Sequence, residues 1–315
     1  MKRFFLLTFF AMMAYGFCFS QEESLDYFDQ FGAIALETSE LTEAKEDLVT
    51  VFHRRDDIVW SKVIYRIIDM RYKQNFPLYY PIQSDDPVHR SLFKVIVDAI
   101  IDGGMPIYEK LADNPRPNFA TPLEKKSIPS LFLIDDPTVD YSNDENHYNI
   151  ETSDAMLVHY NKKKNKLAFN FYPYEGFVRN QLKYLVQEVI FFDKHFSRLF
   201  SKIIAIAPMN SEKITSREPG QESQALMQSV LFWCSFDKLR PFLAQQYILN
   251  SNNDTKRVTF EEFFAKRLFS SYILGEDNID NKMIIDKTTN VQEIQKEQAR
   301  IQNELLTFEQ DLWEY

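Results

Sequence analysis

The residue types that most often carry out chemistry are sparse in this sequence, and their spacing forms no recognised catalytic pattern. The 315 residues include two cysteines, seven glycines and five histidines, namely His53, His89, His147, His159 and His195. The histidines lack metal-ligand spacing, and the sequence contains no CxxC, HExxH, GxSxG or glycine-rich phosphate motif. We therefore predict no catalytic residues, no cofactor and no metal site.

Three weaker candidates for chemistry have structural interpretations that we favour. Cys234 lies beside Trp233 in an apolar segment, where a thiol is more often buried than reactive. The acidic stretch 135–145 lacks the glycine and closing glutamate of a calcium-binding loop. His159 and His195 have apolar flanks that favour a structural role, and only their convergence with carboxylates in a cleft would indicate an enzyme.

Charge and composition exclude one class of partner. The formal net charge is -10 and the sequence pI is about 5.1. The longest basic run is only three lysines, at 162–164, so we expect no nucleic-acid partner. The chain is rich in aromatic residues, with 28 Phe, 16 Tyr and 3 Trp, which supplies material for both a core and binding surfaces.

The first 55 residues read as a targeting segment followed by an acidic arm. Lys2 and Arg3 precede an apolar run that ends in small residues before Gln21, the pattern of a cleaved signal peptide over 1–20. Cleavage would remove one cysteine and leave Cys234 alone, without an internal disulfide. Residues 21–55 hold nine Asp and Glu against three Lys and Arg, and we expect this arm to become ordered on binding a partner.

Two helices are predicted next. Residues 56–73 (DDIVWSKVIYRIIDMRYK) place apolar side chains at helical spacing, with acid at the start and base at the end. Residues 86–104 begin with an Asp-Pro start signal and end with a Gly-Gly stop signal.

The first of these helices carries three candidate interface residues. Trp60, Tyr65 and Arg66 are of the types most common in interface hot spots. The alternative is that they belong to the core and a solvated face, and spacing favours the core for Trp60. Trp313, near the end of the chain, is the fourth candidate interface residue.

The remaining pattern predicts an α+β fold, with a helical N-terminal part followed by antiparallel hairpins and C-terminal helices. Residues 105–154 are irregular and contain six prolines. Hairpins are predicted over 156–172 and over 184–207, with a helix as the alternative for the first half of the second hairpin. The last third predicts a strand at 230–236 and helices at 237–249, 260–275 and 294–312. Thr259 and Glu262 form a capping box that opens the second of these helices, and Gly275 ends it. The third helix carries a narrow apolar seam, made of Ile294, Ile301, Leu305, Phe308 and Leu312.

Six long, aromatic-rich segments stand out along the chain. They are DDIVWSKVIYRIIDMRYKQNFPLYYP, SLFKVIVDAI, FFDKHFSRLFSKIIAIAP, LFWCSFDKLRPFLAQ, FEEFFAKRLFSSYILGEDN and FEQDLWEY. These segments resemble one known family, the GldN/PorN proteins of gliding motility and type IX secretion. They occur in the family's order, cover 56–315 as one domain, and match least between 105 and 180.

The resemblance implies a structural role rather than a reaction. Such proteins are non-catalytic periplasmic subunits that form rings with an outer-membrane lipoprotein of the GldK/PorK type. They also contact the periplasmic arm of the inner-membrane motor, GldM/PorM. We therefore expect a periplasmic location at the outer membrane, with copies of the chain itself as further partners. An accessory paralogue of that subunit, or a periplasmic enzyme with an unrecognised site, remains as an alternative.

Overall fold

The computed structural model describes the greater part of the chain between residue 50 and residue 312. The described residues are 32–35, 50–82, 89–110, 116–124, 128, 158–161, 166–169, 182–218, 221–249, 258–278, 282–288 and 290–312. The predicted signal peptide, most of the acidic arm and the acidic stretch 135–145 lie outside them.

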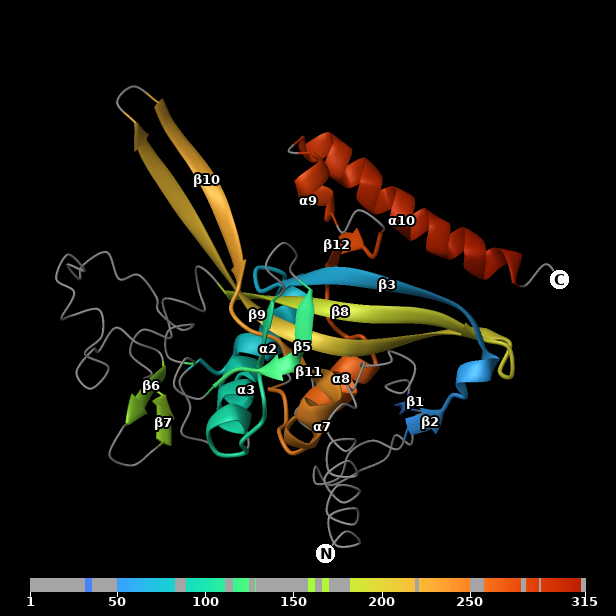
Figure 1. Ribbon diagram of the computed structural model, residues 1–315, viewed down its shortest axis with the longest axis horizontal. Helices are drawn as coiled ribbons and strands as arrows, with labels where there is room; N and C mark the ends of the chain where they lie inside the picture. The colour runs from blue at the N-terminus through green and yellow to red at the C-terminus, as the bar shows by residue number, and fades with distance from the viewer. Residues whose placement is uncertain are drawn as a thin grey trace, which may run out of the picture.

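An antiparallel sheet forms the centre of the fold (Figure 1). Its strands follow the order β10-β9-β8-β3-β12, and the short β11 pairs with β9. They are β3 (Ile58–Asp69), β8 (Leu182–Asp193), β9 (Arg198–Glu218), β10 (Gln221–Val230), β11 (Cys234–Ser235) and β12 (Tyr272–Glu276). The fold is therefore mixed α and β with antiparallel pairing, as the sequence predicts.

The prediction of a helix over 56–73 is wrong, because these residues form β3. The strand lies between β8 and β12, and Ile64, Tyr65, Ile67 and Ile68 are all buried. Burial on both faces of the sheet gives a near-continuous apolar run, which lacks the alternation of a half-exposed strand and resembles a wide helical stripe. The abundance of β-branched residues in this run was the signal that favoured a strand.

The predicted hairpin 184–207 is confirmed, and its helical alternative is wrong. Strands β8 and β9 pair from Leu182↔Asn210 to Asp193↔Arg198, and Ser197 in the turn has a positive φ of 52°. Strand β9 continues beyond this pairing and returns as β10, so the two form a ribbon that projects from the body (Figure 1). Of the predicted strand 230–236, only Cys234–Ser235 forms β11 beside β9, although Val230 ends β10.

The helix predicted over 86–104 is confirmed with a later start. Helix α3 (Leu92–Ile101) begins after Ser91, whose hydroxyl oxygen accepts a hydrogen bond from the Lys94 backbone N–H at 3.4 Å. The Asp-Pro pair lies outside the described residues. Gly104 takes a positive φ of 64° just beyond the helix end, a conformation that glycine adopts without strain.

The next two helices are shorter than predicted. Helix α7 (Phe236–Ala244) ends at Ala244, and α8 (Phe260–Ala265) begins at the predicted cap, where Thr259 Oγ1 accepts from the Glu262 backbone N–H at 3.2 Å. The prediction that Gly275 ends this helix is wrong, because Gly275 lies inside β12. A Cβ there would come within 2.8 Å of the Met283 sulfur, so glycine allows a close approach between β12 and the chain that follows it.

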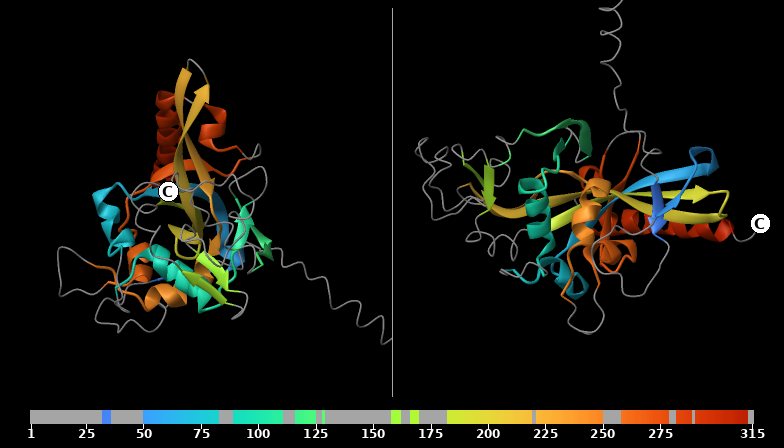
Figure 2. Two further views of the ribbon diagram at one scale, coloured as in Figure 1. Left: turned by 90° about the vertical axis from the view of Figure 1, so that its left-hand side faces the viewer. Right: turned by 90° about the horizontal axis from the view of Figure 1, so that it is seen from below.

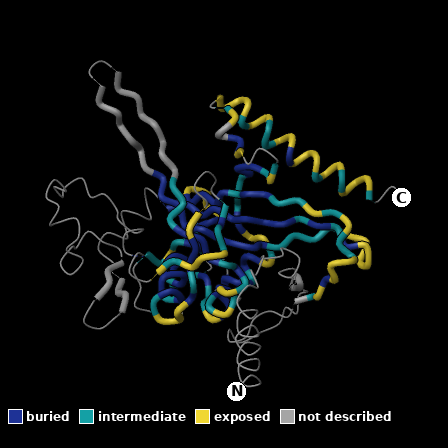
Figure 3. Tube along the Cα trace, in the orientation of Figure 1, coloured by how far each residue is buried: buried dark blue, intermediate teal, exposed yellow. Residues whose placement is uncertain are grey.

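The C-terminal helix matches its prediction. Helix α10 (Val291–Asp311) is preceded by the one-turn α9 (Ile284–Lys287) and packs along the β12 and β3 side of the sheet (Figures 1 and 2). Helices α3, α7 and α8 pack against one another and with the sheet in the largest apolar cluster. Figure 3 shows buried residues concentrated in the sheet and these three helices, whereas α10 is exposed along most of its length.

Smaller elements complete the described chain. The hairpin predicted over 156–172 is confirmed as β6 paired with β7, with Val158 opposite Phe169. The other short elements are β1 (Gly32–Ala35), β2 (Thr50–Phe52), η1 (Arg55–Asp57), η2 (Lys73–Asn75), α2 (Phe76–Tyr79), β4 (Tyr108–Lys110), β5 (Pro117–Pro122), β6 (Val158–Asn161) and β7 (Lys166–Phe169).

Candidate interaction surface at the C-terminal helix

The structure places three of the four candidate interface residues, and their surroundings differ. Tyr65 is fully buried, and its hydroxyl accepts a hydrogen bond from Gln187 Nε2 at 3.1 Å, so Tyr65 belongs to the core. Arg66 is half-buried on the sheet, Trp60 lies against α10, and Trp313 falls outside the described residues.

Trp60 marks the place where the C-terminal helix meets the sheet. Its ring stacks on Phe308 of α10, with ring centroids 4.3 Å apart. Beside this stack, a small apolar cluster joins the helix to the strands. Its members are Ile64, Ile190, Ile273, Ile284, Ile294, Ile301 and Leu305. The predicted helical seam is therefore correct, and Trp60 supports the helix from β3 rather than lying on an exposed surface.

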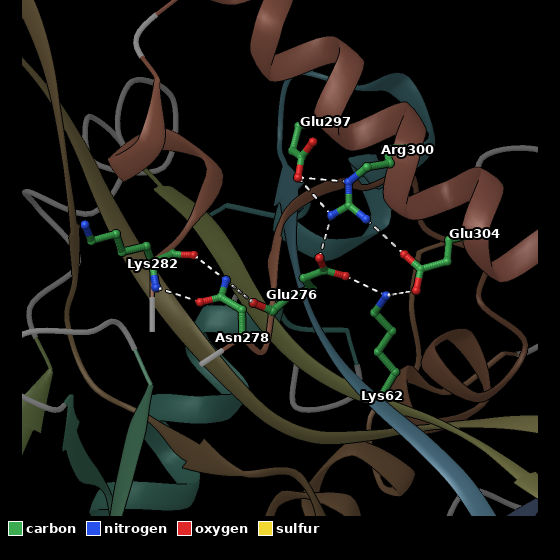
Figure 4. A network of polar contacts seen from close by, with 7 residues as sticks. All are labelled: Lys62, Glu276, Asn278, Lys282, Glu297, Arg300 and Glu304. Carbon is green, nitrogen blue, oxygen red and sulfur yellow. Dashed lines mark hydrogen bonds and ion pairs between the residues drawn. The ribbon is translucent and has the colours of Figure 1, made fainter. Parts of the chain in front are cut away.

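A network of charged side chains borders this apolar seam (Figure 4). Lys62 on β3 contacts Glu276 at 2.6 Å and Glu304 at 2.8 Å. Arg300 on α10 contacts Glu276 at 2.5 Å, Glu297 at 2.8 Å and Glu304 at 3.0 Å. Two cations therefore meet three carboxylates, and Glu276 at the end of β12 is shared by both cations.

Electrostatics favour the charged forms of two members of this network. Burial alone would raise the pKa of Glu276, but hydrogen bonds from Lys62 and Arg300 outweigh it and hold that pKa below its usual range. The pKa of Arg300 is raised, mainly by its hydrogen bonds to Glu297 and Glu276. Glu276 and Arg300 are therefore both ionised at neutral pH.

The lowered pKa of Glu276 predicts that α10 loosens in acid. A carboxylate with a lowered folded pKa stabilises the fold above its unfolded pKa, and that contribution is lost as the pH falls through the folded pKa. We expect amide protection factors in α10 to be constant near neutral pH and to fall selectively below about pH 4.5, the unfolded range for glutamate. In the Glu276→Gln variant the fall should be smaller. Equal loss of protection in α3 and α10 would contradict this prediction.

A buried ion cluster lies on the sheet beneath α8, and sequence reasoning missed it. Glu188 on β8 is almost fully buried and accepts from Arg66 Nε at 2.8 Å. Arg267, just after α8, also pairs with Glu188 through both terminal nitrogens and donates to Ser201 Oγ at 2.7 Å. The one available signal was a charged residue inside the apolar run of β8.

The arginines of this cluster have lowered pKa values, and one of them has an unusual backbone conformation. Arg267 has a positive φ of 52°, which is uncommon for a residue other than glycine. Burial, with a smaller effect of the neighbouring Arg66 charge, lowers the pKa of Arg267 to about 10. Burial also lowers the pKa of Arg66. The two guanidinium groups share one carboxylate, so the cluster depends on Glu188.

A second buried pair joins His53, just after β2, to the β8–β9 turn. His53 Nδ1 lies 2.5 Å from Asp193 Oδ2, and both side chains are almost fully buried. Asp193 Oδ1 also accepts from the backbone N–H groups of His195 and Phe196. Burial alone would raise the pKa of Asp193, but these hydrogen bonds, that of His53 first, hold it below its usual range.

The structure also places the other residues considered for chemistry. Cys234 is fully buried on β11, and burial raises the pKa of its thiol. His195 is exposed in the β8–β9 turn, and His159 lies on β6. Within the described part of the chain, no group of three or more His, Cys, Asp or Glu residues is placed to hold a metal ion. No described helix is long and apolar enough to cross a bilayer.

Comparison with known families places the chain. A family model described as gliding motility associated protein GldN matches residues 53–314. The chain belongs to the GldN family. The match begins at His53, the residue that binds Asp193, and extends to within one residue of the C-terminus. It therefore includes both the sheet and α10. A search of curated proteins finds no match.

Membership of this family bears directly on the type of function. GldN-family proteins are associated with gliding motility and are not a known family of enzymes. In the structure, Glu188 and Asp193 are each paired within the fold. Their geometry supports the sheet and its turn.

Proposed function

We propose that this GldN-family chain is a non-catalytic structural subunit of the type IX secretion and gliding machinery. The observation that carries the proposal is the family match over 53–314. The predicted signal peptide supports secretion into the periplasm. A structural role also agrees with the buried ion pairs, which hold elements of the sheet together and leave their charged groups engaged with one another.

The partners follow from the same proposal. The subunit assembles in rings with an outer-membrane lipoprotein of the GldK/PorK type and contacts the periplasmic arm of a GldM/PorM-type motor protein. The exposed side of α10 is a surface available for such contacts, and the acidic sequence over 21–55 is a second candidate. No membrane segment is needed for this location, because the lipoprotein supplies the anchor.

Deletion and complementation test this function. We expect a strain lacking the gene to lose both gliding and secretion of type IX cargo, and the full chain to restore both. The informative complementing variant is Cys234→Ser, which removes the lone thiol of the predicted mature chain and makes a small change in a buried position. Normal gliding and secretion with this variant would agree with a structural role. A folded Cys234→Ser protein that fails to complement would contradict a non-catalytic role, and unchanged gliding and secretion after deletion would contradict the proposal as a whole.

A further inference from the structure

Helix α10 is attached to the molecule differently from the other helices. Among its 21 residues only Ile301 is fully buried. Its apolar contacts form a cluster separate from the core that holds α3, α7 and α8. Most of the stability of a helix in a protein comes from packing rather than from intrinsic helix propensity. With so little buried surface, α10 depends on the few contacts that it makes with the sheet. It is therefore a candidate for opening as a unit without unfolding the rest.

The contacts that hold α10 are made with β3 and β12, two strands that precede it in the chain. Phe308 stacks on Trp60, and Glu304 pairs with Lys62. The Gln298 side-chain amide donates to the Ile273 carbonyl oxygen at 2.7 Å. Arg300 reaches Glu276 in the same way. All of these contacts join α10 to the sheet. The α10 of a second copy could therefore make the same contacts with this sheet.

The chain between β12 and α10 contains α9, which is held against β12, and a short segment after α9. Met283 packs against Gly275 and Ile284 belongs to the apolar seam, so α9 stays with β12. The Asn278 side chain donates to the Lys282 carbonyl oxygen and accepts from the Lys282 backbone N–H (Figure 4). Only residues 288–290 then separate α9 from α10. If extended, three residues span about 10 Å, and short connections are a setting in which an element can be exchanged between copies.

We propose that α10 is exchanged between copies of this chain, so that the helix of one copy packs on β3 and β12 of the next. The proposal rests on the structural role proposed above, which requires repeated contacts between identical subunits. Donation in one direction gives a head-to-tail contact, and such contacts close into rings when the rotation permits. Holding many copies on one membrane raises their effective concentration and favours exchange over the closed monomer.

Cross-linking between two differently tagged copies tests this exchange. One full-length copy carries Lys62→Cys and the other carries Glu304→Cys, and both are produced in the same cell. Glu304 is 49% exposed, so Glu304→Cys costs little stability, and in Lys62→Cys the Glu276 carboxylate keeps its contact with Arg300. Cys234 is buried and leaves a low background for a thiol-directed reagent. After treatment of envelopes with a short bis-maleimide, we expect a cross-linked product that carries both tags.

A matched control and a second variant define the outcome. Gln302 is exposed on α10 and lies away from Ile301 and Glu304 around the helix, so Gln302→Cys paired with Lys62→Cys should give at least tenfold less mixed product. A single copy carrying both Lys62→Cys and Glu304→Cys should form chains of linked subunits. If this double variant cross-links only within the monomer, and the mixed pair gives no more product than the Gln302 control, the exchange is refuted. Normal gliding in the same strains would show that the proposed function stands apart from this result.

Discussion

The Glu188→Gln variant is expected to lose about 3 kcal/mol of unfolding free energy, a large fraction of the stability of a typical domain. Glu188 is almost fully buried and is the carboxylate partner of both Arg66 and Arg267. Their side chains are only 18% and 37% exposed. Removing the negative charge leaves two guanidinium groups side by side with limited access to water. The unpaired charge, rather than the lost contact, dominates the cost.

Urea unfolding followed by circular dichroism measures this effect, with Glu304→Gln as the matched control. Glu304 also contacts a lysine and an arginine, but its side chain is 49% exposed and its pairs are screened. Such surface pairs contribute about 1 kcal/mol or less. A shift in the unfolding midpoint for Glu188→Gln no larger than that for Glu304→Gln would contradict the assignment of this cluster as a buried support of the sheet.

The second large effect is expected at the β8–β9 turn. Asp193→Ala removes the acceptor of His53 and of two backbone N–H groups in the turn. Hydrogen bonds to a charged acceptor contribute about 1.5–3 kcal/mol, and His53 is buried and loses its carboxylate partner. We expect a loss of about 3 kcal/mol. Residues 50–57 should also lose amide protection more than the rest of the sheet, because His53 attaches them to this turn.

Hydrogen exchange with Asp193→Ala and the control His195→Ala separates local from general loss. The His195 ring is exposed, and the N–H that bonds to Asp193 belongs to its backbone and survives the substitution. His195→Ala should therefore leave the protection of residues 50–57 unchanged. Uniform loss of protection across β3, α3 and residues 50–57 in Asp193→Ala would show that the pair does not act as a local attachment.

Strand β3 shows why the sequence alone can assign the wrong secondary structure. Trp60 was identified as a residue of interest, but on the wrong element, because a strand buried on both faces carries the same dense apolar pattern as a buried helix. Tyr65 shows the same ambiguity, since the residue types found in hot spots are also those that fill a core. Only the pairing of β3 with β8 and β12 resolves it, and such pairing joins segments more than a hundred residues apart.

The sequence predicts features correctly where they depend on residues close together in the chain. The side-chain cap at Thr259 and the seam of α10 depend on residues three to seven positions apart, and both were predicted. The Glu188 cluster was not, because its two arginines lie 122 and 79 residues away in the sequence. Sequence alone shows a charge in an apolar strand but does not identify its partners.

The family and the fold together suggest how the parts of the chain divide their roles. The sheet with α3, α7 and α8 is a rigid body stabilised by buried apolar clusters and ion pairs. Helix α10 packs at its edge with one fully buried residue of its own. In the proposed assembly, α10 and the acidic segment 21–55 make contacts with neighbours, and the body sets their spacing.

Affinity isolation of the GldK/PorK-type lipoprotein from native envelopes tests the central claim most directly. We expect this chain to co-purify in near-stoichiometric amount, as quantified by mass spectrometry, and its cellular level to fall several-fold when the lipoprotein gene is deleted. A partner that binds only the folded chain stabilises it by about 2.7 kcal/mol at a free concentration 100 times the dissociation constant. Absence of the chain from the isolated lipoprotein, with its cellular level unchanged in the deletion strain, would contradict the account.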